Sequence, residues 1–241
     1  MIQRNVSRWS QLSAAAVHLY TASGAVLAFL MVLAAIQGNA VQALWISFLT
    51  LVVDGTDGML ARRFRVSETL PWFDGRKLDD IVDYLTYVFA PILLIWQLGL
   101  LPAGVGGVVM AALPLLASSY QFCRVDAKTD DHFFLGFPSY WNVIAFYAIV
   151  LNLSPATVGA VLIFWSIMVF VPIRYLYPTR TVAFRSTTLT LSALWLLSFV
   201  IILAQMPTPN MLLVNFSLLY MVYYVILSLY MTFRTMRGQK I

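Results

Sequence analysis

Eight apolar segments divide almost the whole chain into stretches close to the length of a bilayer crossing. A transmembrane helix needs about 20 predominantly apolar residues. Because lipid offers the backbone no hydrogen-bond partners, segments that cross it bond internally as helices. The segments lie at 12–36, 40–61, 78–98, 101–123, 139–153, 155–175, 187–206 and 210–233. We therefore predict an all-α, polytopic membrane bundle of about eight transmembrane helices.

The composition agrees with an integral membrane protein. Of the 241 residues, 61% are hydrophobic and 10% are charged, whereas average globular domains carry about 25% charged residues. The polar connections are too short for a separate soluble domain. We predict one integral-membrane domain over 1–241, with a core at 12–175 and two additional C-terminal helices at 187–233. The net charge of +5 forms no single patch, so we expect membrane lipid and no nucleic acid as a partner.

Basic residues mark the orientation of the bundle. All fifteen Lys and Arg lie in the N-terminus, at 62–77, 124–138 and 174–186, or in the C-terminus, and the alternate connections hold none. By the positive-inside rule, both termini and the three long loops face the cytoplasm. Because Arg4 and Arg8 precede an apolar segment, a cleaved signal peptide is an alternative interpretation of this region. The length of that segment favours a first helix that is retained.

Acidic residues concentrate at one level of the predicted bundle. Seven of the ten carboxylates lie between Asp54 and Asp83. Asp54 lies fourteen residues from the outer end of its segment and Asp83 fifteen from the outer end of the next. Both therefore lie about 21–22 Å from the same membrane face. Asp57 and Asp79 lie one turn nearer the cytoplasm. Carboxylates near the end of a membrane helix are costly unless something neutralises them.

Helical spacing places these acids on two stripes. Asp54 and Asp57 are three residues apart, and Asp79 and Asp83 are four apart, so each pair shares one helix face. Asp80 lies about 100° off its stripe and is expected in a supporting or loop position. Carboxylates this close repel one another, and all-oxygen ligands select hard cations. We predict two divalent ions, Mn²⁺ or Mg²⁺, an arrangement that recurs in displacement at phosphorus.

The residues around the acids resemble the CDP-alcohol phosphotransferase family. The family pattern D-x2-D-G-x2-A-R, followed after a spacer by G-x3-D-x3-D, is matched by Asp54, Asp57, Gly58, Ala61, Arg62, Gly75, Asp79 and Asp83. The resemblance implies metal binding by Asp54, Asp57, Asp79 and Asp83, with Asp83 also the catalytic base. The CDP-binding residues that it implies are Asp54, Asp57, Gly58, Ala61, Arg62 and Gly75.

Further features resemble one bacterial branch of that family. The spacer between Arg62 and Gly75 is longer than in the common form of the motif, and segments 18–24 and 134–142 are similar to that branch. The resemblance implies transfer of the phosphatidyl group from CDP-diacylglycerol to choline with release of CMP. It also implies a bacterial inner (cytoplasmic) membrane location and, by analogy, a homodimer. Alternatives are another acceptor (serine, inositol or glycerol phosphate) or, from a different class, a cation transporter.

Choline makes a demand of its own on the site. A quaternary ammonium cannot donate a hydrogen bond, so aromatic faces and a nearby negative charge hold it. Trp and Tyr also collect at membrane interfaces, and an interface role for the same rings stays open. The predicted choline-binding residues are Phe137, Tyr140, Trp141, Asn142 and Tyr84, with Tyr87 as a further candidate.

The other polar residues are assigned structural roles. His18 is expected to form a hydrogen bond between helices, and the lone cysteine, Cys123, is expected to pack as a small residue. His132 is expected in a solvated loop. Side chains expected to mark topology and to reach the interface are Arg124, Arg174, Arg180 and Arg185.

Overall fold

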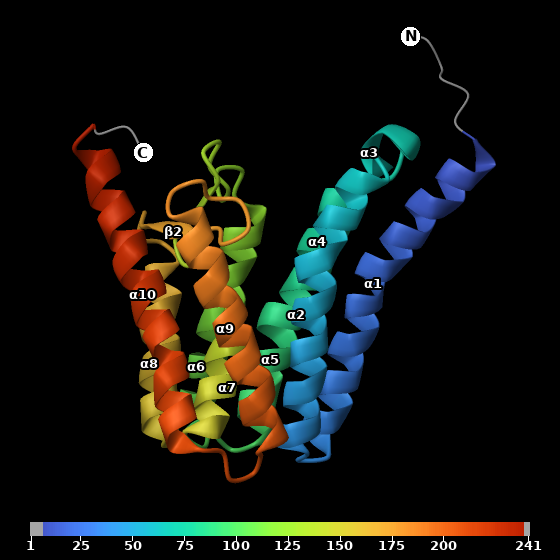
Figure 1. The fold of residues 1–241 in the computed structure, drawn as a ribbon. Coiled ribbons are helices and arrows are strands. Elements are labelled where there is room, and N and C mark those ends of the chain that lie inside the picture. The colour runs from blue at the N-terminus through green and yellow to red at the C-terminus, as the bar shows by residue number, and fades with distance from the viewer. Residues whose placement is uncertain (1–6, 239–241) are drawn as a thin grey trace.

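The computed structural model describes residues 7–238 as a helical bundle with one small sheet (Figure 1). The helices are α1 (Arg8–Ile36), α2 (Ala40–Arg63), α3 (Val66–Thr69), α4 (Gly75–Asp83), the π-helical η1 (Tyr84–Phe89), α5 (Ala90–Gln97), α6 (Val105–Cys123), α7 (Trp141–Val150), α8 (Pro155–Met168), α9 (Arg185–Ala204) and α10 (Met211–Met236). Within the described range, α1, α2, α6, α9 and α10 are long and apolar enough to cross a membrane. The predicted class of all-α, multi-pass membrane protein is confirmed.

Local capping chemistry sets where several helices begin. The side chains of Asn39, Asp74 and Asn210 accept hydrogen bonds from first-turn amides of α2, α4 and α10. These bonds satisfy amides that have no partner within the helix. Ser154 does the same for α8, and Pro155 takes the first helical position, where its missing amide costs nothing. The chain therefore turns tightly between α7 and α8, from Leu151 to Ser154.

The third apolar segment is a continuous helical run of α4, η1 and α5. The wider π-helical turn of η1 ends just before Pro91 in the first turn of α5. A proline ring clashes with the carbonyl four residues earlier, and a π turn relieves such a clash. The run therefore places an irregular turn directly after Asp83. Because this turn is π-helical, the regular four-residue spacing of the acids on α4 is interrupted before Tyr87.

Two of the predicted spans are too short to cross a bilayer alone. The helix α7 has 10 residues and α8 has 14, whereas a crossing needs about 20. After α8 the chain continues into the strand β2 (Arg174–Leu176), which lies in the upper part of the bundle in Figure 1. It pairs antiparallel with β1 (Phe133–Leu135). The polar connection predicted at 124–138 thus contains a strand that the sequence pattern did not indicate.

The helix α10 supplies hydrogen bonds to the backbone of β2. The amide of Arg174 donates to Thr232 Oγ1 at 2.8 Å, and the amide of Leu176 donates to Ser228 Oγ at 3.2 Å. The Tyr224 hydroxyl donates to the Leu176 carbonyl oxygen at 2.9 Å. Non-helical backbone at membrane depth is tolerated only where protein groups satisfy it. These bonds place Tyr224 beside the strand pair.

Glycines let α1 approach α4 closely. A Cβ on Gly24 would lie 2.5 Å from Val82 Cγ1. A Cβ on Gly75 would lie 2.7 Å from His18 Cε1. Any larger residue at either position would push the two helices apart. The contact therefore positions the helix that carries two of the predicted metal ligands.

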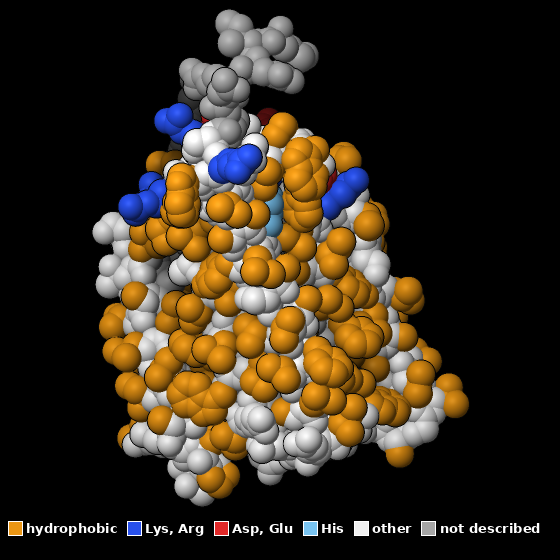
Figure 2. Space-filling model, turned by 90° about the vertical axis from the view of Figure 1, so that its right-hand side faces the viewer, with side chains coloured by type: hydrophobic (Ala, Val, Ile, Leu, Met, Phe, Trp, Pro, Cys, Tyr) orange, Lys and Arg blue, Asp and Glu red, His pale blue; other side chains and the backbone are white. Residues whose placement is uncertain are grey.

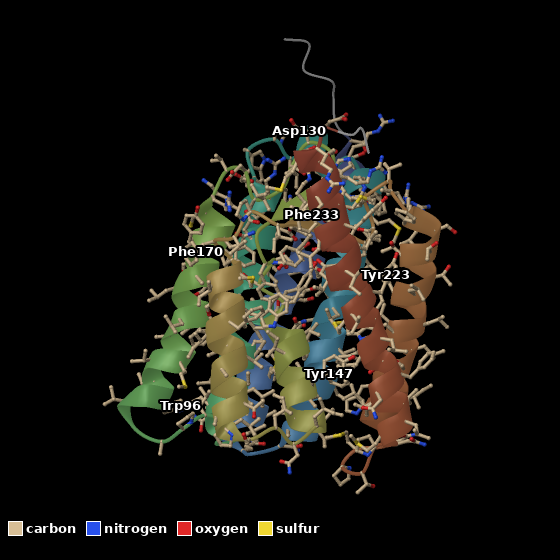
Figure 3. All side chains as sticks on the ribbon, turned by 90° about the vertical axis from the view of Figure 1, so that its left-hand side faces the viewer. Trp96, Asp130, Tyr147, Phe170, Tyr223 and Phe233 are labelled. Atoms are coloured by element: carbon tan, nitrogen blue, oxygen red, sulfur yellow. The ribbon has the colours of Figure 1, made fainter. Side chains whose placement is uncertain are left out.

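Charge is distributed unevenly along the height of the bundle. On the face in Figure 2, hydrophobic side chains cover most of the surface, and the Lys and Arg side chains lie toward the upper end. Both ends of the chain lie at that same end in Figure 1. Figure 3 shows Asp130, in the connection after α6, at that end and Trp96 near the opposite one. The basic side chains on the face in Figure 2 thus gather at one end, as the predicted separation of basic and neutral connections requires; Arg4 and Lys240 lie outside the described residues.

Candidate active site

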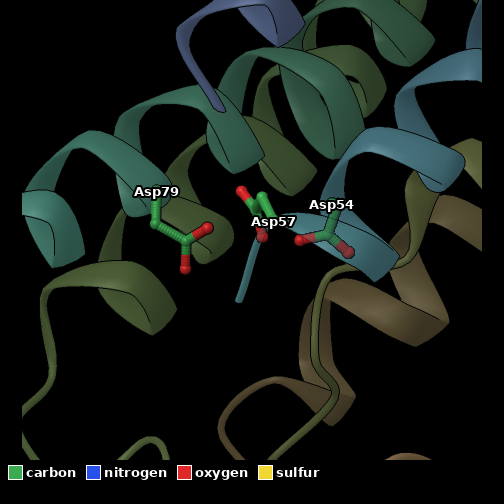
Figure 4. Close-up of side chains that lie close together, drawn as sticks. All are labelled: Asp54, Asp57 and Asp79. Atoms are coloured by element: carbon green, nitrogen blue, oxygen red, sulfur yellow. The ribbon is translucent and has the colours of Figure 1, made fainter. Parts of the chain in front are cut away.

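Carboxylates of α2 and α4 converge between the two helices. One oxygen from each of Asp54, Asp57 and Asp79 lies within 4.8 Å of the others. Figure 4 shows the side chains of Asp54 and Asp57 on α2 and that of Asp79 on α4. Ligands on opposite sides of one Mg²⁺ are about 4 Å apart, so the trio has nearly the size of one coordination sphere. Its donors are all carboxylate oxygens, which fits a hard divalent cation.

Asp83 lies at the edge of this cluster. Its carboxyl group interacts directly with that of Asp54, but it is not part of the trio that meets within 4.8 Å. It is one helical turn beyond Asp79 on α4. The four predicted acids therefore occupy one region, with Asp83 on the side of Asp54.

Neutral hydroxyl groups orient two of the acids. The Tyr87 hydroxyl donates to Asp54 Oδ2 at 2.6 Å, and Thr21 Oγ1 donates to Asp57 Oδ2 at 2.8 Å. Tyr87 and Thr21 are both buried. Partners of this kind fix the direction of metal-binding groups. Thr21 was not predicted as a site residue, although segment 18–24, which contains it, carried part of the resemblance.

The connection after α6 brings a cation to the acids. Lys128 forms an isolated antiparallel bridge with Phe134 of β1. Its Nζ lies 4.0 Å from Asp80 Oδ1. Its charge also reaches Asp54, Asp79 and Asp83. Asp80 thus has the predicted supporting position, and Lys128 is a site residue that sequence reasoning missed.

The predicted CDP-binding residues at the ends of α2 and α4 are partly engaged with the protein itself. The guanidinium of Arg62 lies over Gly58, where a Cβ would be 3.3 Å from Nη1. Ala61 packs against an apolar cluster between α1 and α3. Gly75 lies against the ring of His18. Their contacts with a nucleotide stay predictions.

Of the predicted choline-binding residues, Tyr140 adjoins the acid cluster. Its ring lies 6.1 Å from that of Tyr87, and the charge of Asp54 acts on it. Trp141 has no exposed surface, and its indole donates to Ser118 Oγ at 2.7 Å. The Tyr84 hydroxyl donates to a backbone carbonyl of α6 at 3.1 Å. The polar atoms of Trp141 and Tyr84 are thus already used within the protein.

Asn142 is buried without using its hydrogen-bonding capacity. It is 3% exposed, and both amide atoms have no hydrogen-bond partner among the described residues. Buried polar side chains almost always have a partner. Its surroundings therefore suit a water molecule or a polar ligand. Phe137, the remaining predicted residue, is buried and packs edge to face on Trp141 at 5.3 Å.

Two structural predictions are wrong. The Nε2 of His18 is buried without a hydrogen-bond partner in residues 7–238. The ring instead packs on Phe73, with centroids 4.2 Å apart, because Gly75 leaves room for it. Cys123 is exposed rather than packed, since it lies at the last position of α6 where the chain leaves the helix.

The loop arginines have specific partners as well as topological positions. Arg124 donates to both carboxylate oxygens of Asp126 at 2.7 Å, which lowers the pKa of Asp126. Arg174 pairs with Asp131 and lies over the ring of Phe133 at 4.8 Å. Exposed positions, as predicted, are found for His132, Arg180 and Arg185.

Comparison with known proteins identifies the class of protein that this site defines. A family model described as CDP-alcohol phosphatidyltransferase matches residues 16–173. The chain belongs to the CDP-alcohol phosphatidyltransferase family. It is 40% identical to a protein of Legionella bozemanae named phosphatidylcholine synthase, over 82% of this chain and 94% of that protein.

Two further relatives carry the same name. The chain is 40% identical to the phosphatidylcholine synthase of Legionella pneumophila, over 93% of this chain and 91% of that protein. It is 34% identical to that of Borreliella burgdorferi, over 91% of this chain and 94% of that protein. The relatives thus align well beyond residue 173, where the family model ends. Membership makes the chain an enzyme of phosphatidyl transfer rather than a cation transporter.

Proposed function

We propose that the protein transfers the phosphatidyl group of CDP-diacylglycerol to choline, forming phosphatidylcholine and releasing CMP. The observation that carries this proposal is the convergence of Asp54, Asp57 and Asp79 beside the aromatic ring of Tyr140. Acids that hold divalent cations suit a diphosphate, and aromatic faces suit a quaternary ammonium. The name shared by the relatives supports the same reaction.

We assign two divalent cations, Mn²⁺ or Mg²⁺, to Asp54, Asp57, Asp79 and Asp83. One oxygen from each of the first three acids lies within 4.8 Å of the others, a spread nearly the size of one coordination sphere, and Asp83 adjoins Asp54. When bound, the cations neutralise the diphosphate and the charge that develops on the leaving CMP. The hydroxyl groups of Tyr87 and Thr21 hold two of these acids in direction.

Asp83 is assigned as the general base of the reaction. The choline oxygen forms a bond to the phosphorus that carries the diacylglycerol, and Asp83 takes the hydroxyl proton. The bond from that phosphorus to the CMP oxygen breaks, and CMP leaves with the electron pair. A base must lie within hydrogen-bond reach of the proton it removes. We assign the acceptor hydroxyl to a position beside Asp83, which adjoins Asp54 of the metal trio.

The nucleotide and the diphosphate are assigned to the basic end of the site. Arg62 is exposed near the end of α2 and carries the charge that the nucleotide end requires. We assign Gly58, Ala61 and Gly75 to the same nucleotide region. Lys128 pairs with Asp80 at 4.0 Å, its charge acts on Asp54 and Asp79, and we assign it to the diphosphate. A lysine provides phosphate with a mobile point charge.

The surroundings of Tyr140 favour choline over an anionic acceptor. Glycerol phosphate or the carboxylate of serine requires converging basic side chains, whereas Tyr140 is surrounded by aromatic rings. Phe137 and Trp141 pack behind it, and Tyr84 packs toward α6. Asn142 offers an unused buried amide nearby in the chain. We therefore assign these five predicted residues to the lining or the support of the acceptor site.

We place the active site on the cytoplasmic side of a bacterial inner membrane. The basic side chains gather at the end of the bundle that holds the chain ends (Figures 1 and 2), and basic loops stay on the cytoplasmic side. CDP-diacylglycerol can then remain in the bilayer while its headgroup reacts. The homodimer stays a prediction.

The test uses purified protein in lipid vesicles that contain CDP-diacylglycerol. Release of CMP is measured with choline, serine, inositol or glycerol 3-phosphate, each with and without Mn²⁺. We expect CMP and phosphatidylcholine with choline and Mn²⁺, loss of the reaction with EDTA, and recovery when Mn²⁺ is restored. Release with serine but not choline would contradict the acceptor. No release with any acceptor would contradict the transferase assignment.

A further inference from the structure

An aromatic cluster extends from the acid site into segments that lie beyond the family match. Tyr140, within the match, has its ring 6.1 Å from Tyr87, which holds Asp54. It also lies 6.4 Å from Phe134 and 6.3 Å from Tyr224 of α10. Phe134 in turn stacks on Tyr177 at 4.7 Å. Tyr177 and Tyr224 both lie after residue 173, where the family model ends.

The rings around Tyr140 meet it at an angle and do not stack face to face on it. Its four ring contacts all lie between 6.1 and 6.4 Å and meet at an angle. By contrast, Phe146 and Phe199 stack at 3.8 Å. A cation binds to a ring face within about 6 Å of the centroid. Rings that meet at an angle leave part of their faces uncovered for a small cation, whereas closely stacked rings, such as Phe134 on Tyr177, cover one face of each other.

The fold holds Tyr177 and Tyr224 against this cluster. Tyr224 reaches it because its hydroxyl donates to the carbonyl of Leu176 at the end of β2. Tyr177 follows directly in the chain, and its amide donates to Thr181 Oγ1 at 2.9 Å. The charges of Lys128, Asp54, Arg180 and Asp79 all act on Tyr177, and the Arg180 guanidinium lies 5.8 Å from the centre of its ring. Burial raises the pKa of the Tyr177 hydroxyl, so the side chain is neutral at physiological pH.

The acceptor itself requires such a neighbourhood. In choline, two carbons separate the reacting hydroxyl from the quaternary nitrogen, so the groups that recognise the nitrogen must adjoin the base. The aromatic cluster begins one ring away from Asp54, and Asp54 is the neighbour of Asp83. Nearby negative charge and ring faces are the two features that hold a quaternary ammonium.

We infer that Tyr177 and Tyr224, together with Tyr140, form the wall that recognises the trimethylammonium group. The inference rests on the proposed function. It divides the work between two parts of the chain: the family domain supplies the transfer of the phosphatidyl group, and β2 with α10 sets which alcohol accepts it. Tyr177 and Tyr224 are specificity-determining residues that sequence reasoning did not identify.

The test compares choline with 3,3-dimethylbutan-1-ol, in which carbon replaces nitrogen, so that the shape is kept and the charge is lost. The variants are Tyr177→Leu and Tyr224→Leu, with Tyr177→Phe and Tyr224→Phe retaining the rings. Tyr230→Leu is the matched control, because Tyr230 also lies on α10 but is 47% exposed. Activity with both alcohols, the KM for each substrate and the melting temperature in detergent are measured.

Each leucine variant is expected to raise the choline KM by about 2- to 30-fold. The KM for CDP-diacylglycerol and the activity with the neutral alcohol should stay at the wild-type level, as should every value for Tyr177→Phe and the control. Tyr224→Phe keeps the ring but loses the hydrogen bond to the Leu176 carbonyl, so its melting temperature should fall while its ratio of choline activity to neutral-alcohol activity stays at the wild-type level. An unchanged choline KM, or an equal loss with both alcohols in a folded variant, would overturn the inference. Should Tyr224→Leu unfold, Tyr177→Leu decides. A wild-type enzyme that rejects choline would instead refute the proposed function.

Discussion

The two walls of the proposed active site are assembled differently. The acid wall comes from two neighbouring helices, α2 and α4, and hydroxyl groups from α1 and η1 orient its members. The aromatic wall comes from β1, the start of α7, β2 and α10, which are far apart in the chain. The first wall consists of charged ligands with fixed directions, and the second consists of neutral ring faces.

This difference shows how each function is encoded. Metal ligands must meet within a coordination sphere, so they occur at fixed helical spacings and form a local motif. Ring faces need only surround a cation, so segments distant in sequence can supply them. Changes in the acid wall should therefore abolish turnover, whereas changes in the aromatic wall should shift the choice of acceptor.

The largest effect is expected for Asp79→Asn. It removes one of the three converging carboxylates. Loss of a group that only hydrogen-bonds to a metal ligand lowers activity by about 10- to 100-fold, and we expect kcat to fall by more than this when a ligand itself is lost. CMP release at saturating Mn²⁺ measures it. Asp130→Asn, in the exposed connection after α6, is the control and should stay at the wild-type rate. Normal turnover in Asp79→Asn would refute the metal assignment.

Tyr87→Phe should have the next largest effect. It removes the 2.6 Å hydrogen bond to Asp54 but keeps the ring, so kcat should fall by about 10- to 100-fold, with a higher Mn²⁺ concentration needed for half-maximal rate. The choline KM should change little. Tyr230→Phe is the control. A variant that altered the choline KM alone would place Tyr87 in the aromatic wall instead of the acid wall.

Thr21→Val tests whether α1 belongs to the acid wall. The substitution keeps the shape of the side chain and removes the 2.8 Å hydrogen bond to Asp57. We expect kcat to fall by about tenfold, the lower end of the range for outer partners of metal ligands, and the Mn²⁺ requirement to rise. Thr190→Val on the exposed surface of α9 should have no effect. Equal activity of the two variants would show that the site does not depend on α1.

Lys128→Met should have the smallest effect. Its ammonium is partly exposed and 4.0 Å from Asp80, and an exposed ion pair contributes about 0 to 1 kcal/mol. The KM for CDP-diacylglycerol should therefore rise by about 2- to 5-fold, while the choline KM stays constant. Lys128→Arg should retain most of the wild-type behaviour. A change confined to choline would assign Lys128 to the acceptor side.

The acid wall and the membrane class were predictable from the sequence. Apolar length fixes the number of helical segments, and counting residues from the outer ends gives the depth of Asp54 and Asp83. Helical spacing then gives the shared faces. These local rules place Asp54, Asp57 and Asp79 at one level and on shared helix faces, and the packing of the helices then brings them together.

The aromatic wall was only partly predictable. Tyr140 was identified, but Tyr177 and Tyr224 join it through a strand pair whose three-residue strands leave no clear alternation in sequence. The role of Tyr87 depends on the π-helical turn, which breaks regular spacing after Asp83. Lys128 reaches the acids only because its connection folds back onto β1. Each of these contacts depends on tertiary structure.

The most direct test of the account is the number of Mn²⁺ ions that the purified protein binds in the presence of CDP-diacylglycerol, measured by electron paramagnetic resonance. The wild-type protein should bind two ions per chain, and Asp79→Asn should bind fewer, while Tyr177→Leu should bind two. A wild-type protein that binds no Mn²⁺ at saturating concentration, or an Asp79→Asn variant that binds as many ions as the wild type, would contradict a metal centre between α2 and α4.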